Sequence, residues 1–444
     1  MSRIAELAEA GEPSELRAEL DAVGALDIAE ELSRLAPAAM AVPFRLLTKD
    51  RALEVFEALD PVHQQQLLEG LRDERVRELV AGLDPDDRAR LLDEVPAKVA
   101  KRLQQGLSAA QRAETATLLG YPAESAGRIM TPAYVSLRAS MTAADAVAKV
   151  RRQGGDAETV YTLPVTDDRR ILQGVVGLRA LVTAAPATPV AALMATDVLR
   201  AEVTDDQEDV ARLMQEADLL ALPVVDHESR LVGVVTVDDA MEVLEREVTE
   251  DVSRSGAVEP LEQPYLSAGV GVLARKRAAW LLLLGIAAVL TVNVLGAFEA
   301  TLEEVVTLAL FIPLLIDTGG NSGAQASTVV IRALSLGEVR FGDLPRVAGR
   351  EVLVGVVLGA MLAAVALPAV SLFFGLQFGT IIALTLLAIV VWATLAGAVL
   401  PLIGARVGLD PAVMAAPIIT TLVDATGLLI YFGIATAVLA GGVG

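Results

Sequence analysis

Residues 222–240, LPVVDHESRLVGVVTVDDA, show that part of this chain is a repeat, because the same pattern occurs twice. The counterpart, LPVTDDRRILQGVVGLRAL at residues 163–181, aligns with it without a gap. In each copy a short apolar run leads into a polar turn that begins at an aspartate, Asp167 or Asp226, and a second apolar run follows. The pattern predicts a strand, a turn, a second strand and the start of a helix.

A second pair of matched segments lies upstream of these two copies. MTPAYVSLRASMTAADAVAKV and MATDVLRAEVTDDQEDVARLM both end with the apolar spacing of an amphipathic helix. The repeated unit of strand, helix, two strands and helix resembles the tandem cystathionine-β-synthase-like (CBS) module. We therefore assign residues 128–250 to an α/β tandem CBS module, with copies at about 130–186 and 190–250.

The regions on either side of this module differ in composition. Residues 1–127 carry apolar residues at spacings of three and four, and Asp-Pro pairs at 60–61 and 84–85 mark two helix starts, so we expect an all-α domain of helical hairpins. Residues 271–444 contain 8 Lys/Arg and 9 Asp/Glu, whereas the rest of the chain contains 28 and 48, a net charge of −20. An acidic soluble half is thus joined to a nearly neutral, apolar half.

The apolar half predicts a five-helix α transmembrane domain at residues 275–444, after a connecting (plug) helix and linker at 251–274. Each predicted span is long enough to cross a hydrocarbon layer about 30 Å thick. The spans lie at 278–298, 305–334, 352–374, 378–404 and 411–439. Basic residues precede the first span and follow the second and the fourth, and such loops stay on the cytoplasmic side. We expect a multidomain protein of the cell (inner) membrane, with the N-terminus and soluble domains cytoplasmic and the C-terminus outside.

Composition also excludes several classes of protein. There are no cysteines and only two histidines, which leaves oxygen ligands for any metal. The N-terminus has no basic region followed by an apolar run, so it does not read as a cleaved signal peptide. The acidity favours cations and argues against nucleic acid. No nucleophile–base set, P-loop or zinc motif occurs, so we do not expect an enzyme.

Polar residues interrupt the second predicted span. Asp317, Asn321 and Gln325 are four residues apart and would form one stripe on a helix. Such a stripe serves either hydrogen bonding between helices or a pore lining. Small residues lie beside it and would let another helix approach closely. These helix-packing residues are Gly319, Gly320 and Gly323.

The fifth predicted span carries an acidic residue, Asp424, on the same helix face as Thr420. Pro417 has no N–H, so the carbonyl of Val413 loses its helical partner and can face ions or water. Apart from Arg332, at the cytoplasmic end of span two, no basic residue occurs inside any span to pair with Asp424. We therefore assign ion binding in a pore to Asp424, Thr420, Val413, Asp317 and Asn321. These oxygen ligands suit Mg²⁺, Ca²⁺ or Mn²⁺, and the composition does not choose among them.

The chain resembles the MgtE family of magnesium channels nearly from end to end. The resemblance rests on YPAESAGRIMTP (121–132), RLVGVVTVDD (230–239), PLLIDTGGNSGAQASTVVIRAL (313–334) and GLDPAVMAAPIITTLVDATGLLIYF (408–432). It implies a homodimer in membrane lipid, with the pore between the two copies of spans two and five. It also implies that the aspartate matching Asp424 holds the permeating Mg²⁺.

The resemblance further implies that cytoplasmic Mg²⁺ binds between the helical domain, the tandem module and the connecting helix, and holds the channel closed. The residues that match this regulatory site are Asp87, Asp239, Glu242, Glu247, Glu250 and Asp251. His63 stands where an acidic contact would be expected. Facing acidic surfaces repel, and a divalent ion between them reverses the sign of the interaction.

Gly233, Thr236 and Asp239 are spaced as in nucleotide-binding copies of the module, so one adenine-nucleotide site per chain is a further expectation. Two functions other than a Mg²⁺-gated, Mg²⁺-selective channel stay open. One is a broader divalent-cation transporter coupled to a gradient. The other is a membrane-anchored nucleotide or metal sensor whose spans only dimerise it, which an unpaired Asp424 disfavours.

Overall fold

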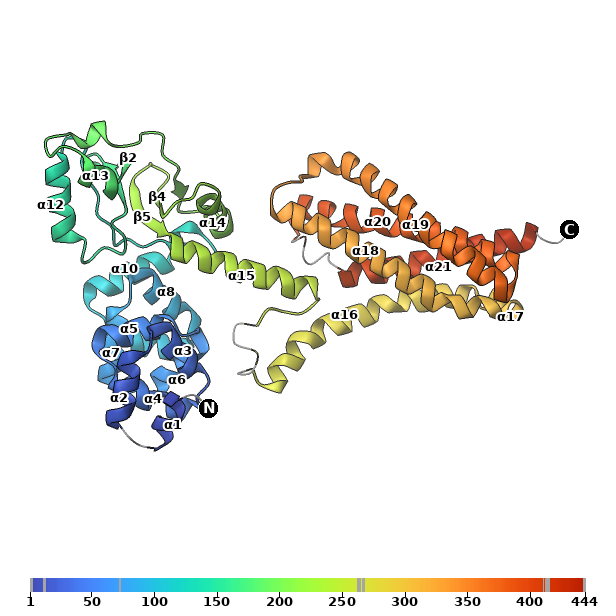
Figure 1. Ribbon diagram of the computed structural model, residues 1–444, viewed down its shortest axis with the longest axis horizontal. Helices are drawn as coiled ribbons and strands as arrows, with labels where there is room; N and C mark the ends of the chain where they lie inside the picture. Colours follow the sequence, from blue (N-terminus) through green and yellow to red (C-terminus); the bar gives the residue numbers. More distant parts are fainter. Residues whose placement is uncertain are drawn as a thin grey trace. The chain divides into compact units, whose positions relative to one another are not determined.

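The computed structural model describes residues 3–10, 13–71, 73–261, 265, 268–409, 411 and 416–441. The chain divides into two units, Met1–Glu247 and Val248–Gly444. Helices form the start of the first unit and all of the regular structure described in the second, and the strands gather in one region of the first unit (Figure 1).

The first unit begins with a series of short helices whose starts follow from local chemistry. Asp60 caps α6, because its side chain accepts hydrogen bonds from the backbone N–H groups of Val62 and His63. Pro61 and Pro85 occupy the first positions of α6 and α8, where the missing N–H removes no hydrogen bond. Both predicted Asp-Pro helix starts are confirmed. The helices are α1 (Arg3–Ala10), α2 (Pro13–Ala22), α3 (Ala25–Ser33), α4 (Pro37–Leu46), α5 (Lys49–Glu57), α6 (Pro61–Gly70), α7 (Asp73–Gly82), α8 (Pro85–Glu94), α9 (Ala97–Gln104) and α10 (Ala109–Leu119).

These helices share one apolar core. Phe44, Phe56 and Leu67 are fully buried within it. Burial of a side chain of this size contributes about 1.5–3 kcal/mol. Because helices this short are marginal alone, their stability comes mainly from this packing.

The tandem module repeats most of its structure as it repeats its sequence. The leading strand that we expected in each copy is present in the second copy as β3, whereas in the first copy Leu137 forms only an isolated bridge with Val165. In the first copy β1 pairs with β2 antiparallel, and Leu163 lies opposite Val176. In the second copy β3, β4 and β5 form one sheet, and Leu222 lies opposite Val235. The elements are α11 (Ala126–Ile129), α12 (Ala143–Gln153), β1 (Thr162–Thr166), β2 (Leu172–Gly177), α13 (Leu178–Thr183), β3 (Ala201–Glu202), α14 (Gln207–Glu216), β4 (Ala221–Val225) and β5 (Leu231–Thr236).

The two turns between the paired strands are built alike. Oδ1 of Asp167 accepts hydrogen bonds from the backbone of Arg169 and Ile171, and Oδ1 of Asp226 accepts the equivalent pair. Arg170 and Ser229 have positive φ values of 66° and 59° at matching positions. The predicted strand, turn, strand and helix start is therefore confirmed in both copies.

The last helix of the module, α15 (Val237–Ser255), is longer than the repeat requires. No glycine or proline occurs between its ends, and Gly256 follows directly. Because nothing in the sequence breaks the helix earlier, α15 runs past residues 250 and 251, where the tandem module is expected to end. The next described helix, α16, begins at Val270, five residues before the expected start of the membrane domain.

The second unit consists of long helices. Among the described residues, four are long and apolar enough to cross a membrane: α16, α19, α20 and α21. A fifth, α18, has 24 residues and begins at Ile312, seven residues after the expected start of span two, because Val306–Phe311 form a 3₁₀ helix. The polar stripe that begins at Asp317 lowers the hydropathy of α18. The elements are α16 (Val270–Ala297), α17 (Glu299–Glu304), α18 (Ile312–Ser335), α19 (Leu344–Phe374), α20 (Leu376–Arg406) and α21 (Ala416–Gly441).

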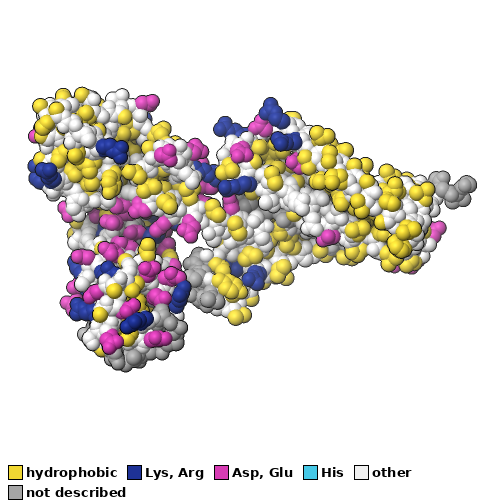
Figure 2. All heavy atoms as spheres, viewed as in Figure 1, with side chains coloured by type: hydrophobic (Ala, Val, Ile, Leu, Met, Phe, Trp, Pro, Cys, Tyr) yellow, Lys and Arg dark blue, Asp and Glu magenta, His cyan; other side chains and the backbone are white. Residues whose placement is uncertain are grey.

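Glycines set the closest approaches between these helices. An added Cβ at Gly397 of α20 would lie 2.3 Å from the carbonyl oxygen of Gly323 on α18. One at Gly359 of α19 would lie 2.8 Å from Leu387 Cα on α20. On the outer faces of these helices, large apolar side chains such as Leu281 of α16 are exposed. Figure 2 shows apolar side chains over much of this unit's surface. Such a surface suits lipid.

Candidate metal sites

α18 and α21 come close enough to form one wall. An added Cβ at Gly320 would lie 2.8 Å from Thr420 Cγ2 and 3.7 Å from Asp424 Oδ1. Gly319 and Gly323 are equally crowded, since an added Cβ would lie 3.0 Å from Val423 at the first and 2.9 Å from Ile419 at the second. Backbone in place of side chains at these three positions therefore brings the Asp424 carboxylate against α18.

One oxygen of the Asp424 carboxylate, the buried Oδ1, has no hydrogen-bond donor in the part of the chain that the structure describes. Thr420 lies one helical turn earlier on the same face of α21. A buried carboxylate oxygen with no donor and no nearby base is suited to a cation or its hydration shell.

Three other residues of the predicted pore are placed differently. Asp317 and Asn321 lie on α18, as expected, but both are exposed in the single chain, as is Gln325. No hydrogen bond joins either of them to Asp424 among the residues that the structure describes. Val413 lies outside the described residues.

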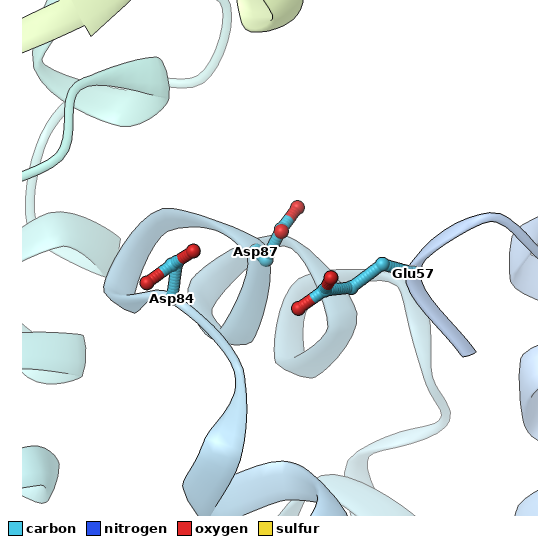
Figure 3. A group of neighbouring side chains, drawn as sticks. All are labelled: Glu57, Asp84 and Asp87. Atoms are coloured by element: carbon cyan, nitrogen blue, oxygen red, sulfur yellow. The ribbon is translucent and has the colours of Figure 1, made fainter. Parts of the chain in front are cut away.

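In the first unit, three carboxylates meet at the end of α5 and the start of α8. Glu57, Asp84 and Asp87 each offer an oxygen within 4.8 Å of the others (Figure 3). Burial, followed by the charges of Asp87 and Asp84, raises the pKa of Glu57 to about 7, against the influence of Arg90. The sequence predicted Asp87 as a regulatory ligand but did not predict Glu57 or Asp84, although Asp84 directly precedes Pro85 at the start of α8.

A second group of carboxylates joins three parts of the first unit. Asp86 comes from α8, Glu158 from the loop before β1, and Asp239 from the first turn of α15, and their oxygens lie within 4.8 Å of one another. Asp86 is only 6% exposed. Asp86 Oδ1 and Glu158 Oε2 are buried and have no hydrogen-bond partner among the described residues.

The electrostatics of this second group favour a bound cation. Burial, followed by the charges of Asp239 and Glu158, raises the pKa of Asp86. Burial also raises the pKa of Glu158 to about 7 and that of Asp239 to about 8. The Thr236 hydroxyl lies 2.6 Å from Asp239 Oδ2 and 3.0 Å from Glu158 Oε1, and its one proton can serve only one of them. An all-carboxylate set with unpaired buried oxygens fits a hard divalent ion such as Mg²⁺.

The other acidic residues predicted on α15 have separate partners. Glu242 and Asp87 both pair with Arg90. Glu247 accepts a hydrogen bond of 3.2 Å from the Gln207 side chain. Glu250 pairs with Arg254, and Asp251 lies 3.5 Å from the hydroxyl of Ser335. Of the six predicted regulatory residues, only Asp87 and Asp239 belong to a three-carboxylate group among the described residues.

The predicted nucleotide residues overlap with the second acidic group. Thr236 is buried and contacts Asp239. The sequence predicts Asp239 both as a Mg²⁺ ligand and as a nucleotide contact. An added Cβ at Gly233 would lie 2.6 Å from Met130 Sδ, so this glycine is needed for packing. His63 is buried with its ring Nδ1 against the Asp60 carboxylate at the start of α6, which is a structural position.

Three family models match the chain. They are the MgtE intracellular N domain at residues 24–124, the CBS domain at 126–187 and 190–246, and the divalent cation transporter MgtE at 312–434. The last of these includes α18 and residues 416–434 of α21, the part that carries Asp424.

Curated relatives match over most of their length. The magnesium transporter MgtE of Thermus thermophilus is 41% identical over 75% of this chain and 74% of that protein. The magnesium transporter MgtE of Bacillus subtilis is 37% identical over 74% and 73%. The cytosolic domain of the Mg²⁺ channel MgtE in complex with ATP matches with a TM-score of 0.52 and 38% identity, covering 54% of this chain and 97% of that one. The soluble part of a magnesium transporter gives a TM-score of 0.51 at 28% identity, covering 55% and 96%.

Proposed function

Because this chain belongs to the MgtE family of magnesium transporters, we propose that it is a Mg²⁺-selective channel in which Asp424 binds the permeating ion. The observation that carries the proposal is the buried Oδ1 of Asp424, which has no hydrogen-bond partner among the described residues and lies beside Gly320 and Thr420. Mg²⁺ loses its water reluctantly and is usually held by one or two carboxylates with several waters retained. One aspartate from each of two chains would meet that requirement.

The proposed pore lies between two copies of the chain. Asp317 and Asn321 are exposed on α18. A carboxylate that faces lipid costs about 2.5–3.5 kcal/mol on insertion scales. These two side chains would therefore face a second copy of the chain and an ion pathway instead of lipid. Membrane lipid would then cover the apolar faces of α16 and α19.

The proposed gate is the contact of α8 with α15 and the loop before β1. Asp86, Glu158 and Asp239 would hold a regulatory Mg²⁺, which cancels the repulsion among the three carboxylates. This unit would lie in the cytoplasm and the C-terminus outside. The contact tightens when the cell is rich in Mg²⁺, and the pore closes.

A nucleotide is a proposed second ligand. The solved cytosolic domain that matches this chain is described in complex with ATP, which supports an adenine-nucleotide site in the tandem module here. Thr236 and Asp239 would take part in both sites, so ATP and Mg²⁺ binding would be coupled. Calorimetry of ATP binding with and without Mg²⁺ tests this coupling.

The direct test of the pore is Mg²⁺ flux into liposomes that contain the purified protein and a Mg²⁺-sensitive dye. Asp424→Asn should abolish the flux while the protein still assembles. Glu338→Gln, the same change of charge at an exposed position outside the long helices, should leave it unchanged. Normal flux through Asp424→Asn would refute the pore assignment. A flux of Mn²⁺ or Ca²⁺ equal to that of Mg²⁺ would favour a broader divalent-cation transporter. Mg²⁺ uptake that stops when an ion gradient is collapsed would indicate coupled transport.

A further inference from the structure

One arginine lies among the carboxylates that join α8 to α15. Arg90 donates from one guanidinium nitrogen to Asp87 Oδ1 at 2.5 Å, and from the other to Glu242 Oε2. The Arg90 and Asp87 side chains are 28% and 23% exposed, so the pair is shielded from salt better than a surface pair. The guanidinium thus links two helices that would otherwise repel each other.

The surroundings of Arg90 are almost entirely acidic. Burial lowers the pKa of Arg90, but Asp87, Glu242, Glu94 and Asp239 together raise it above its ordinary value. On α15, Arg246 acts electrostatically on Glu94 of α8. Among the described residues, Arg90 forms ion pairs with a carboxylate of each helix, Asp87 of α8 and Glu242 of α15.

We propose that Arg90 is a tethered cation that occupies Asp87 and Glu242 and so sets the Mg²⁺ sensitivity of the gate. This rests on the proposed function, in which Mg²⁺ bridges the same helices through Asp86, Glu158 and Asp239. Arg90 holds the contact partly assembled when Mg²⁺ is scarce. It also keeps Asp87 and Glu242 from binding free Mg²⁺, so fewer ions complete the closure.

The contact with Arg90 explains why Asp87 and Glu242 lie outside the carboxylate group of Asp239. Asp87 and Glu242 were expected to bind Mg²⁺ directly, and both face Arg90 instead. Removal of the guanidinium would free Asp87 to act with Glu57 and Asp84, whose oxygens lie within 4.8 Å of its own. The variant contact would then be weaker without Mg²⁺ and would respond to more ions.

The absence of native cysteine allows a clean measurement on the full chain. Glu94→Cys and Arg246→Cys place one thiol on α8 and one on α15, in a pair close enough to interact electrostatically, and together leave the net charge unchanged. A short bifunctional maleimide then reports the contact as the yield of cross-linked protein. The yield is measured in EDTA and across a Mg²⁺ titration, in detergent and with Arg90, Arg90→Gln or Arg90→Lys.

In EDTA, Arg90→Gln should lower the yield by roughly tenfold, the effect of about 1.4 kcal/mol. Its recovery with Mg²⁺ should be steeper than that of the parent protein. Arg90→Lys keeps the charge and should retain most of the yield, and Arg75→Gln, which removes an ion pair elsewhere in the helical domain, should match the parent.

Equal yields from Arg90→Gln and the parent in EDTA would overturn the inference. A parent yield that ignores Mg²⁺ would instead overturn the proposed regulation. In that case a deficit of Arg90→Gln in EDTA would still support Arg90 as the cation that holds the contact, so the two failures are distinguishable.

Discussion

Lowering the pH from 8 to 6 should weaken Mg²⁺ binding at Asp86, Glu158 and Asp239 by two to three orders of magnitude. The pKa of Asp239 is raised to about 8 and that of Glu158 to about 7, mainly by burial. Mg²⁺ requires ionised carboxylates, so protons must leave as it binds. With these pKa values, protonation of Asp239 between pH 8 and pH 6 lowers the Mg²⁺ affinity by about 1.7 orders of magnitude. Protonation of Glu158 lowers it by about 1.0 order of magnitude more.

The same values fix the number of protons released. At pH 7 a group with pKa 8 is mostly protonated and one with pKa 7 is half protonated, so roughly 1.4 protons leave Asp239 and Glu158 per Mg²⁺. Any proton held by Asp86, whose pKa is also raised, adds to this number. Without a divalent ion, the raised pKa values mean that the folded state binds more protons than the unfolded state. The stability contributed by Asp239 is then fully present below its ordinary pKa of 3.8 and is lost as the pH rises through about 8.

Calorimetry of Mg²⁺ binding to the full chain, in pairs of buffers with different ionisation enthalpies, measures both quantities. Asp239→Asn removes the carboxylate with the higher pKa of the two. The proton release that remains from Glu158 should be about half a proton at pH 7, and the Mg²⁺ affinity should drop. Asp209→Asn, an exposed position in the first turn of α14, is the matched control. An affinity that is constant between pH 6 and 8, with no proton release, would refute the reasoning.

Three further predictions concern packing. Gly397→Ala should destabilise the membrane helices by about 1–3 kcal/mol, because the new Cβ would lie 2.3 Å from the carbonyl oxygen of Gly323, whereas Gly433→Ala meets no atom within 4 Å and should be neutral or stabilising; thermal unfolding in detergent compares them. Gly320→Leu should stop Mg²⁺ flux without preventing membrane insertion, and normal flux would show that α18 and α21 need not approach closely. Asp60→Ala removes the N-cap of α6 and should cost about 1 kcal/mol in denaturant unfolding, and no change would show that the cap is dispensable.

Local chemistry explains which parts of the fold could be predicted. The turns at Asp167 and Asp226 are encoded within a few residues, since each side chain accepts from its own turn, and the sequence repeat made them visible. The starts of α6 and α8 follow equally from Asp-Pro pairs. The end of α15 depends on Gly256, which marks where the helix stops more reliably than the length of the repeat does.

The acidic groups depend on contacts between distant segments, which local spacing does not reveal. Glu158 meets Asp239 and Asp86 although the three are far apart in sequence and Glu158 lies in a loop without a pattern. Arg90 reads as an ordinary base on a charged helix, and only the tertiary contact shows that it faces Glu242. Asp424 was predictable because a carboxylate is conspicuous in an apolar span, whatever it contacts.

In the proposed function, Mg²⁺ both permeates this protein and closes it from the cytoplasmic side. Recording from excised patches, with Mg²⁺ as the only permeant cation and with its cytoplasmic concentration stepped from micromolar to millimolar, tests both parts at once. We predict that Mg²⁺ current is present at low cytoplasmic Mg²⁺ and falls as Mg²⁺ rises. A variant with Asp86→Asn, Glu158→Gln and Asp239→Asn should conduct and stay open at millimolar Mg²⁺. Current that is insensitive to cytoplasmic Mg²⁺ in the unmodified protein, or that closes equally in the triple variant, would contradict the account.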